Sequence, residues 1–428
     1  MTAAPADGSL PAAAATAPTS GRLPTEVSAT GETLLITVSG PDRPGVTRRL
    51  FQRLSTFPLV VLDVEQVVIR GELVLGVLVA QPEGVDTALA EVAALATGIG
   101  VELGMKVTVS PGAPERTTDE RGRLHITLLG APLRPDAMGA LAGCVADHGG
   151  NIDRIERLAS YPVTAIELLV SGAEPQALRS ALSAEAVRVG FDVAVQRAGL
   201  FRRGKRLVVM DVDSTLIQGE VIEMLAAHAG VEDQVAAITE QAMRGEIDFR
   251  QSLEARVALL AGLDETALDT VRADVELSPG ARTLVRTLKR LGFKCGIVSG
   301  GFTQVTDALV AQLDLDFAAA NTLEIVDGVL TGRLVGSVID REGKATALVR
   351  FATDADVPLS HTVAIGDGAN DLDMLERAGL GIAFNAKPVV RQAADAAVNV
   401  PYLDAVLFLL GITREEIDAA DAADTPSA

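Results

Sequence analysis

The sequence predicts an α/β protein: a doubly wound parallel sheet with a helical cap, preceded by two small ferredoxin-like domains of βαββαβ order. Two observations carry this prediction. From residue 205 onward, apolar segments of strand length alternate with helical segments, which is typical of a parallel sheet covered on both faces. Before residue 205, one order of strands and helices occurs twice, which indicates an internal repeat.

Composition limits the function. The chain has 428 residues, of which 48% are hydrophobic and 3% aromatic, so its cores are built mainly from aliphatic side chains. Its net charge is −20, from 57 acidic and 37 basic residues. Such a charge repels nucleic acid and anionic membranes, so neither is an expected partner, and a phosphate site needs its own local positive charge.

The sequence also bears on the compartment. Cys144 and Cys295 are far apart and show no metal or redox spacing, which favours two reduced thiols in a cytoplasmic protein. No apolar run approaches the ~18–20 residues of a membrane span, and we expect no signal peptide. Residues 1–30 are expected to be a disordered leader, and residues 413–428 an acidic, frayed tail.

The first βαββαβ unit is expected at residues 31–110 and the second at 121–200, joined by a linker rich in Pro, Thr and charge. In the first unit, Val46, Leu50 and Leu54 recur at helical spacing after the first strand. The expected strands are 33–40, two within 60–80 that turn near Gly71, 101–110, 123–130, 151–159, 163–172 and 191–198. The expected helices are 41–56, 85–100, 136–150 and 175–190.

Both units resemble ACT domains, the small-molecule-sensing modules of amino-acid-metabolising enzymes. GPDRPGV at 40–46 matches the loop after the first strand of that family, and GGNID at 149–153 is typical of it. The second unit departs from the pattern with GAPLRPDAM at 130–138. The resemblance implies regulation by an amino acid such as serine, and sheet edges that pair between chains in a homodimer. The alternative is a purely structural scaffold.

The α/β domain is expected at residues 205–412. Its predicted strands are 205–214, 294–301, 362–368, 379–384 and 396–400, with a helix at 281–292 and a hairpin at 322–336 that turns at Asp327–Gly328. Ligands of such sheets bind beyond the carboxyl ends of the strands. The polar residues at these strand ends and at helix starts are Asp211, Asp213, Ser299, Gly300, Lys344, Asp367 and Asp371.

These residue types indicate phosphate chemistry. A lone pair of aspartates is often a solvated turn, but here four acids, a lysine and a Ser-Gly-Gly share one sheet edge. Clustered carboxylates repel unless a cation lies among them, and an oxygen-rich site suits Mg²⁺. Attack by the Asp211 carboxylate splits phosphoester hydrolysis into two steps through an aspartyl-phosphate. Asp213 is placed to protonate the leaving group and then to accept a proton from water.

Four motifs occur in order: DVDST at 211–215, SGG at 299–301, Lys344, and GDGAND at 366–371. They resemble the motifs of the haloacid dehalogenase-type phosphatases, and within that superfamily the phosphoserine phosphatases. The resemblance implies that Asp211 is the nucleophile. It also implies that the Asp211 and Asp367 side chains and the Asp213 backbone carbonyl bind Mg²⁺. Asp371 would hold a metal-bound water or orient Lys344.

The resemblance also assigns substrate contacts. Ser299, the Gly300 amide and Lys344 would bind the phosphoryl oxygens, and Asn370 matches a position that contacts phosphate or substrate. Residues 219–278 form the expected cap.

Within this cap, the resemblance implies that Glu220 binds the substrate ammonium and Arg256 the substrate carboxylate, with Phe249 and Met243 nearby. From the residues alone, Glu220 and Arg256 also fit a solvated helix face. Phe249 and Met243 likewise fit ordinary core positions.

The residues leave three hypotheses for function. The first is Mg²⁺-dependent hydrolysis of O-phospho-L-serine to L-serine and phosphate, the last step of serine biosynthesis, under regulation by an amino acid. The second keeps the mechanism but takes another small phosphoester, such as homoserine phosphate. The third is an amino-acid sensor with a vestigial phosphatase domain.

Overall fold

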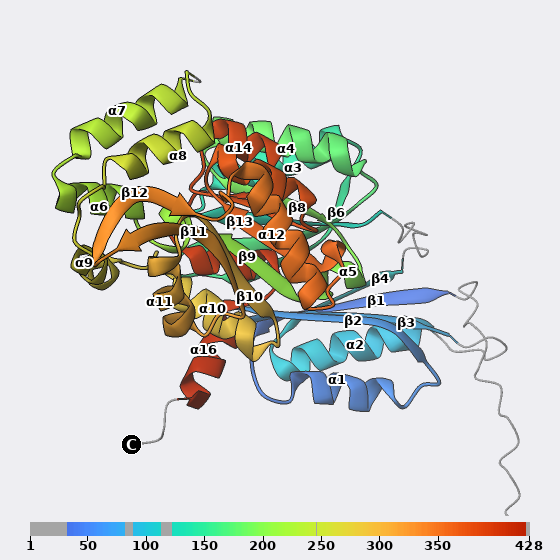
Figure 1. Ribbon diagram of the computed structural model, residues 1–428. Helices are drawn as coiled ribbons and strands as arrows, with labels where there is room; N and C mark the ends of the chain where they lie inside the picture. The colour runs from blue at the N-terminus through green and yellow to red at the C-terminus, as the bar shows by residue number, and fades with distance from the viewer. Residues whose placement is uncertain (1–31, 82–88, 113–121, 245, 425–428) are drawn as a thin grey trace, which may run out of the picture. The chain divides into compact units, whose positions relative to one another are not determined.

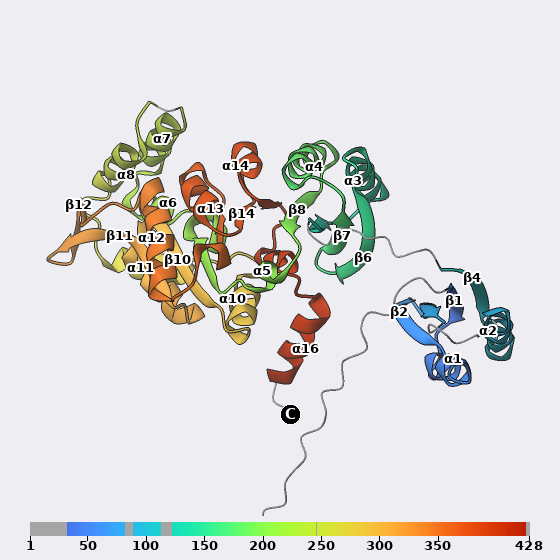
Figure 2. The same ribbon diagram turned by 90° about the vertical axis from the view of Figure 1, so that its right-hand side faces the viewer.

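The computed structural model describes residues 32–81, 89–112, 122–244 and 246–424 (Figures 1 and 2). The predicted leader at 1–30 lies outside these residues. The chain divides into two compact units, residues 1–117 and 118–428. Among the described helices, none has the length and apolar character needed to cross a bilayer.

The first unit is a four-stranded antiparallel sheet with two helices. Its elements are β1 (Thr33–Pro41), α1 (Val46–Leu54), β2 (Val60–Ile69), β3 (Glu72–Ala80), α2 (Leu89–Leu103) and β4 (Lys106–Pro111), with strand order β2-β3-β1-β4. Alternate residues of β1 and β3, such as Ile36 and Val77, form a core with Leu50 of α1 and Val92 of α2. The period of two therefore places one sheet face against the helices.

The boundary between α2 and β4 differs from the prediction. Residues 101–103 were expected in the last strand, but they continue α2. The helix ends before Gly104, whose φ of +62° is the left-handed conformation that commonly terminates helices. The apolar residues of 101–103 fit a helix as well as a strand, so their pattern alone could not locate this end.

The second unit begins with the second repeat. Its elements are β5 (Leu124–Gly130), α3 (Pro135–Asp147), β6 (Asn151–Ala159), β7 (Thr164–Ser171), α4 (Pro175–Val189) and β8 (Asp192–Arg197), followed by the short helix α5 (Leu200–Arg203). Leu124, Ile126 and Leu168 face α3 and α4 in a shared core. The predicted repeat of βαββαβ order is therefore present.

The α/β part that follows has a central parallel sheet. Its strands are β9 (Leu207–Asp211), β10 (Lys294–Phe302), β11 (Phe317–Val326), β12 (Val329–Val335), β13 (Thr362–Gly366), β14 (Gly381–Phe384) and β15 (Ala396–Val398). Val208 and Met210 enter the core on one face, whereas Leu207 and Val209 enter the core on the other. Both faces are thus covered, as a doubly wound sheet requires. The predicted hairpin is confirmed, because Val326 of β11 pairs with Val329 of β12.

Helices cover the two faces and one end of this sheet. Those packed along it are α10 (Ala281–Arg290), α11 (Thr303–Leu313), α12 (Arg341–Asp354), α13 (Leu372–Arg377), α14 (Pro388–Ala393) and α15 (Val406–Leu409). The insertion after β9 forms α6 (Val221–Ala229), α7 (Glu232–Met243), α8 (Phe249–Ala258) and α9 (Thr266–Asp274). The insertion is helical as predicted, and α6 to α8 gather at one end of the α/β part (Figure 1).

The second repeat and the α/β part share one sheet of eleven strands, in the order β12-β11-β10-β9-β13-β14-β15-β8-β5-β7-β6 (Figure 2). The junction is a single antiparallel pairing of Ala194 in β8 with Ala396 in β15. Leu129 and Ala165 of the second repeat are buried in the same core as Leu407 of α15. The two parts are therefore continuous, which the sequence did not predict.

The C-terminal prediction of a frayed tail from residue 413 is wrong for the described residues. Arg414–Asp424 form α16. Ile417 is 1% exposed, so one apolar residue anchors the helix. Asp421 pairs with both Arg286 and Arg290 of α10. The acidic residues that suggested a solvated tail are thus partly neutralised by α10.

Candidate active site

The candidate site lies at the carboxyl ends of β9, β10 and β13, the neighbouring central strands. Asp211 is the last residue of β9 and pairs in register with Val298 of β10, so Ser299 follows immediately beside it. Asp367 comes directly after β13. The predicted convergence of these motifs at one edge of the sheet is therefore what the strand order produces.

The loop after β9 aims two carboxylates. Asp211 accepts a hydrogen bond from the backbone N–H of Val212 at 2.8 Å, and its side chain is almost fully buried. Ser214 has a left-handed φ of +58°, which turns the chain sharply after the strand. Asp213 accepts from the Val221 N–H at 2.8 Å and from the Ser299 hydroxyl at 3.0 Å. Both carboxylates are thus held by hydrogen bonds.

Lys344 is the buried cation of the site. Its Nζ lies 2.6 Å from Asp211 Oδ1 and 2.7 Å from Asp371 Oδ1. Burial opposes its charge, but the two carboxylates outweigh burial and raise the pKa of Lys344. Asp371 also accepts a hydrogen bond from the Gly368 N–H at 3.0 Å. Lys344 is therefore a fixed positive charge beside Asp211, as an anionic substrate requires in this acidic protein.

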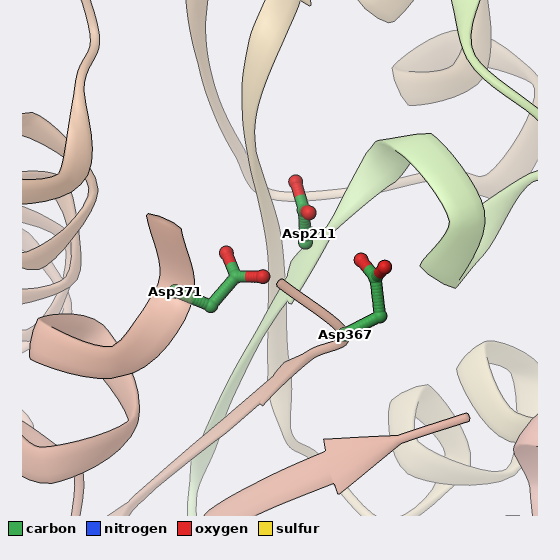
Figure 3. Close-up of side chains that lie close together, drawn as sticks. All are labelled: Asp211, Asp367 and Asp371. Atoms are coloured by element: carbon green, nitrogen blue, oxygen red, sulfur yellow. The ribbon is translucent and has the colours of Figure 1, made fainter. Parts of the chain in front are cut away.

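Three carboxylates form a candidate metal site. Asp211, Asp367 and Asp371 each place an oxygen within 4.8 Å of the others, and the three side chains converge in Figure 3. Burial, then Asp371, raises the pKa of Asp367 to about 6, and burial also raises the pKa of Asp211. Two buried acids and one partly buried acid beside one lysine leave negative charge to be neutralised. This all-oxygen donor set fits Mg²⁺.

Asp211 and Lys344 line a cavity of about 470 Å³, and residues of the cap form part of its wall. Arg256 of α8 also lines it, and its NH1 lies 3.5 Å from Oε2 of Glu220. Burial, then the charge of Asp213, raises the pKa of Glu220. The cavity therefore carries a charged pair in addition to the carboxylate cluster.

Gly300 packs closely against the cap. A Cβ at this position would lie 3.1 Å from Cζ of Phe249, which is tighter than ordinary van der Waals contact. Phe249 and Arg256 come from the same helix and both line the cavity. The cap thus approaches the strand end closely, and a side chain at 300 would require Phe249 to move by a few tenths of an ångström.

Comparison with known proteins places this geometry in a family. Residues 205–379 match the haloacid dehalogenase-like hydrolase model. The phosphoserine phosphatase of Streptomyces coelicolor is 60% identical over 91% of this chain and 94% of its own length. The phosphoserine phosphatase of Mycobacterium tuberculosis is 55% identical over 91% of this chain and 96% of its own length.

The chain belongs to the phosphoserine phosphatases of the haloacid dehalogenase-like hydrolase family. As in that family, it is an enzyme. Residues 32–110 and 124–196 each match an ACT domain, which confirms the resemblance of both repeats. A solved structure of a probable phosphoserine phosphatase from Vibrio cholerae, 36% identical, covers 71% of this chain and 90% of its own with a TM-score of 0.55.

Nearly all the residues predicted for this phosphatase site lie around one cavity. Those that line it are Asp211, Asp213, Glu220, Phe249, Arg256, Gly300, Lys344, Asp367 and Asn370. Ser299 and Asp371 are fully buried just behind them. The hydroxyl of Ser299 donates to Asp213 and accepts from the Gly301 N–H at 2.7 Å. The side chain of Met243, the last residue of α7, lies outside the described residues.

Several polar residues at the site were not predicted, among them Thr215, Arg341 and Lys387. Thr215 donates a hydrogen bond to Asp367 Oδ1 at 3.3 Å, and Arg341 and Lys387 line the cavity. Lys387 lies in the loop after β14, so the rule that ligands bind at carboxyl ends of strands would have found it. Thr215 and Arg341 carried no comparable signal, because a hydroxyl in a loop and a charge at a helix start are common.

Proposed function

We propose that the chain hydrolyses O-phospho-L-serine to L-serine and phosphate, closing serine biosynthesis. The observation that carries the proposal is the cavity itself. It is lined both by Asp211 beside Lys344, which suits a phosphoryl group, and by Glu220 beside Arg256. A substrate with phosphate, ammonium and carboxylate groups matches these charges in kind. The names of the relatives support the same substrate.

In the proposed mechanism, Asp211 attacks phosphorus and the bond from phosphorus to the serine oxygen breaks. Asp213 gives its proton to that oxygen, which leaves as a hydroxyl. Water then attacks the aspartyl-phosphate, Asp213 takes a proton from it, and the bond between phosphorus and Asp211 breaks. The hydrogen bonds of Asp213 to Val221 and Ser299 hold its carboxylate near both reacting oxygens.

Fixed charges and dipoles would stabilise the transition state. Lys344 and the Gly300 amide supply positive charge or a hydrogen-bond donor to the phosphoryl oxygens, and Ser299 would donate its single hydroxyl proton to them once Asp213 is protonated. Asn370 contacts phosphate or substrate. Mg²⁺ would be held by the Asp211 and Asp367 side chains and the Asp213 carbonyl, and when bound it offsets the repulsion between carboxylate and phosphate. The contact of Asp371 with Lys344 supports an orienting role for Asp371.

Substrate choice is proposed to depend on the pair formed by Glu220 and Arg256. Arg256 NH1 lies 3.5 Å from Oε2 of Glu220. A bound amino acid would exchange this contact for two of its own: its ammonium with Glu220 and its carboxylate with Arg256. Phe249 would pack over the reacting end beside Gly300, and Met243 is proposed to belong to the same wall.

Phosphate release with Mg²⁺ tests the chemistry. Asp211→Asn keeps the size of the side chain but removes the nucleophile, so we expect activity to fall by at least about 10³-fold. Thermal unfolding of the variant controls for folding. Equal rates for wild type and Asp211→Asn would refute Asp211 as nucleophile and support the vestigial-domain hypothesis.

A substrate panel tests recognition. Arg256→Ala should lower kcat/KM for phosphoserine about ten- to hundredfold and reduce the preference over phosphoesters without a carboxylate. Arg244→Ala is the control, because this cap arginine is exposed and pairs with Glu240 and Glu246. An unchanged preference in Arg256→Ala, or a higher rate with homoserine phosphate, would favour the second hypothesis.

We further infer an amino acid effector such as serine at the ACT domains, a cytoplasmic location and a homodimer. The buried, unpaired Cys144 and Cys295 support a reducing compartment. The edge strand β2 supports pairing between chains, because Val61, Val64 and Val67 are all more than 40% exposed. A monomer mass in solution would exclude the dimer, and unchanged activity with serine would exclude that effector.

A further inference from the structure

A second cavity, of about 230 Å³, lies in the second repeat, away from the catalytic cavity. Its charged and polar lining residues are His125, Arg154, Glu156, Glu167, Arg202 and Arg203. Leu410 and Gly411, which follow α15, complete the wall. The cavity is therefore built by the ACT sheet, the α5 connection and the α/β part together.

The sheet residues of this cavity belong to the face that α3 and α4 do not cover. Leu124, Ile126 and Leu168 point to the helices, so the alternate residues His125 and Glu167 point the other way. The first repeat lacks this polar pair. In the second repeat, Glu167 of β7 pairs with Thr127 of β5. At the equivalent positions of the first repeat, Gly76 of β3 pairs with Thr37 of β1. In the same register, Leu35 takes the place of His125. The charges are thus specific to the second repeat.

The charged groups at the base of the cavity are fixed in place. Glu167 lies 3.0 Å from His125 Nδ1 and pairs with Arg202, which is 9% exposed. Arg202 also donates a hydrogen bond to the Leu409 carbonyl at 3.3 Å. Burial opposes ionisation, but His125 and Arg202 outweigh burial and lower the pKa of Glu167. The base therefore presents an ionised carboxylate attached to the α/β part through Arg202.

The rim adds further charges. Arg154 lies 3.6 Å from Glu156, and both are about half exposed. Arg203 is exposed, and no ion pair of its side chain occurs among the described residues. Three guanidinium groups against two carboxylates leave a positive excess here, in a chain of net charge −20. Charges of both signs around a small polar cavity suit a zwitterion better than an apolar ligand.

We propose that this cavity binds a small free amino acid, its carboxylate at Arg203 and Arg154 and its ammonium at Glu156 and Glu167. The volume is below the roughly 300–1,000 Å³ usual for ligand sites, which limits the ligand to a small molecule. The site deepens the regulation proposed above. It differs from the loop at 40–46, and it contacts the α/β part directly through residues 409–411.

Calorimetry with the full-length chain tests the site, with L-serine and glycine as probes. Arg203→Gln and Glu156→Gln are both at exposed positions, so their folding should be unaffected. Each should weaken binding about tenfold or more, as expected for the loss of one charged hydrogen bond. Arg188→Gln is the matched control, because this exposed arginine is on α4 and pairs with Glu185. It should bind as wild type does.

Two more variants separate this site from the others. Binding to the catalytic cavity should weaken in Arg256→Ala, and binding at the loop 40–46 in Asp42→Asn; binding to the proposed site should survive both. Phosphate release, measured separately, reports on the proposed catalytic function alone. The proposal is overturned if wild type binds neither probe, if Arg203→Gln and Glu156→Gln bind normally, or if acetate or inorganic phosphate competes as well as glycine.

Discussion

The two ACT repeats have the same fold but use the same sheet face differently. In the first repeat, Leu35 and Val74 are 38% and 41% exposed on the face opposite the helices. In the second, the position of Val74 is taken by Ala165, which is fully buried in the core of the α/β part. One repeat is a unit with its own core, whereas the other is part of the catalytic body.

The difference shows that an ACT domain can be fused to an enzyme without changing its fold. The junction combines a strand pairing with polar contacts. Beside the pairing of Ala194 with Ala396, Arg179 of α4 lies 2.7 Å from Asp395, which in turn accepts from the Gly381 N–H at 3.0 Å. These residues flank α14, whose Val390 lines the catalytic cavity. The second repeat thus supports one wall of the active site.

Among these predictions, the largest effect on stability is expected from Leu129→Ala. Leu129 is fully buried at the junction, so its truncation should lower the free energy of unfolding by about 2–5 kcal/mol. The equivalent position of the first repeat, in the same register, is Ser39, which is not fully buried. Ser39→Ala should change stability by less than about 0.5 kcal/mol. Urea denaturation measures both, and equal losses would contradict the distinction between the repeats.

Asp192→Ala should lower the free energy of unfolding nearly as much as Leu129→Ala. Asp192 accepts from the backbone N–H groups of Asn399 at 2.6 Å and Val400 at 3.2 Å, and its removal leaves buried donors unpaired. We expect a loss of about 2–3 kcal/mol. Lys106 holds this position in the first repeat and is exposed, so Lys106→Ala should have little effect. In Asp192→Ala, amide hydrogen exchange should become faster at residues 380–400. Unchanged exchange there would show that Asp192 does not stabilise this part of the α/β domain.

Mg²⁺ should stabilise only the second unit. At about 100 times its dissociation constant, a ligand specific for the folded state adds about 2.7 kcal/mol. Protection from hydrogen exchange should therefore rise in β9 and β13 and stay constant in β1 to β4. Chelation should reverse the effect, and Asp367→Asn should weaken it. Equal protection of the first unit would argue against a site at Asp211 and Asp367.

A smaller effect on stability is expected from a change of pH. Burial lowers the pKa of Lys205 to about 8, against the opposing charge of Asp395. Between this value and 10.5 the folded state binds fewer protons than the unfolded state, so stability rises with pH. Relative to Lys205→Met, wild type should gain up to about 1 kcal/mol between pH 7.5 and 9. A constant difference between the two proteins would show that Lys205 is not desolvated.

Local patterns explain what could be predicted. Asp211 follows a run of buried residues, and Ser299 and Asp367 follow two more, so strand ends located the site before any contact was known. The strands and helices of both repeats followed from periodicity. The contact of Glu220 with Arg256 was not predicted, because the resemblance set each residue against a different group of the substrate. The fusion of β8 to β15 had no local signal, because two alanines about two hundred residues apart specify no partner.

The junction also has a consequence for the order of synthesis. The first repeat has all its strands once residue 111 is made, whereas the inner face of the second repeat is completed by Leu407 and its neighbours in α15. At roughly 5–20 residues per second, a ribosome needs about 10–40 s to travel from β8 to α15. During this interval Leu129 and Ala165 lack their final partners. The nascent second repeat therefore keeps part of an apolar face uncovered until α15 is made.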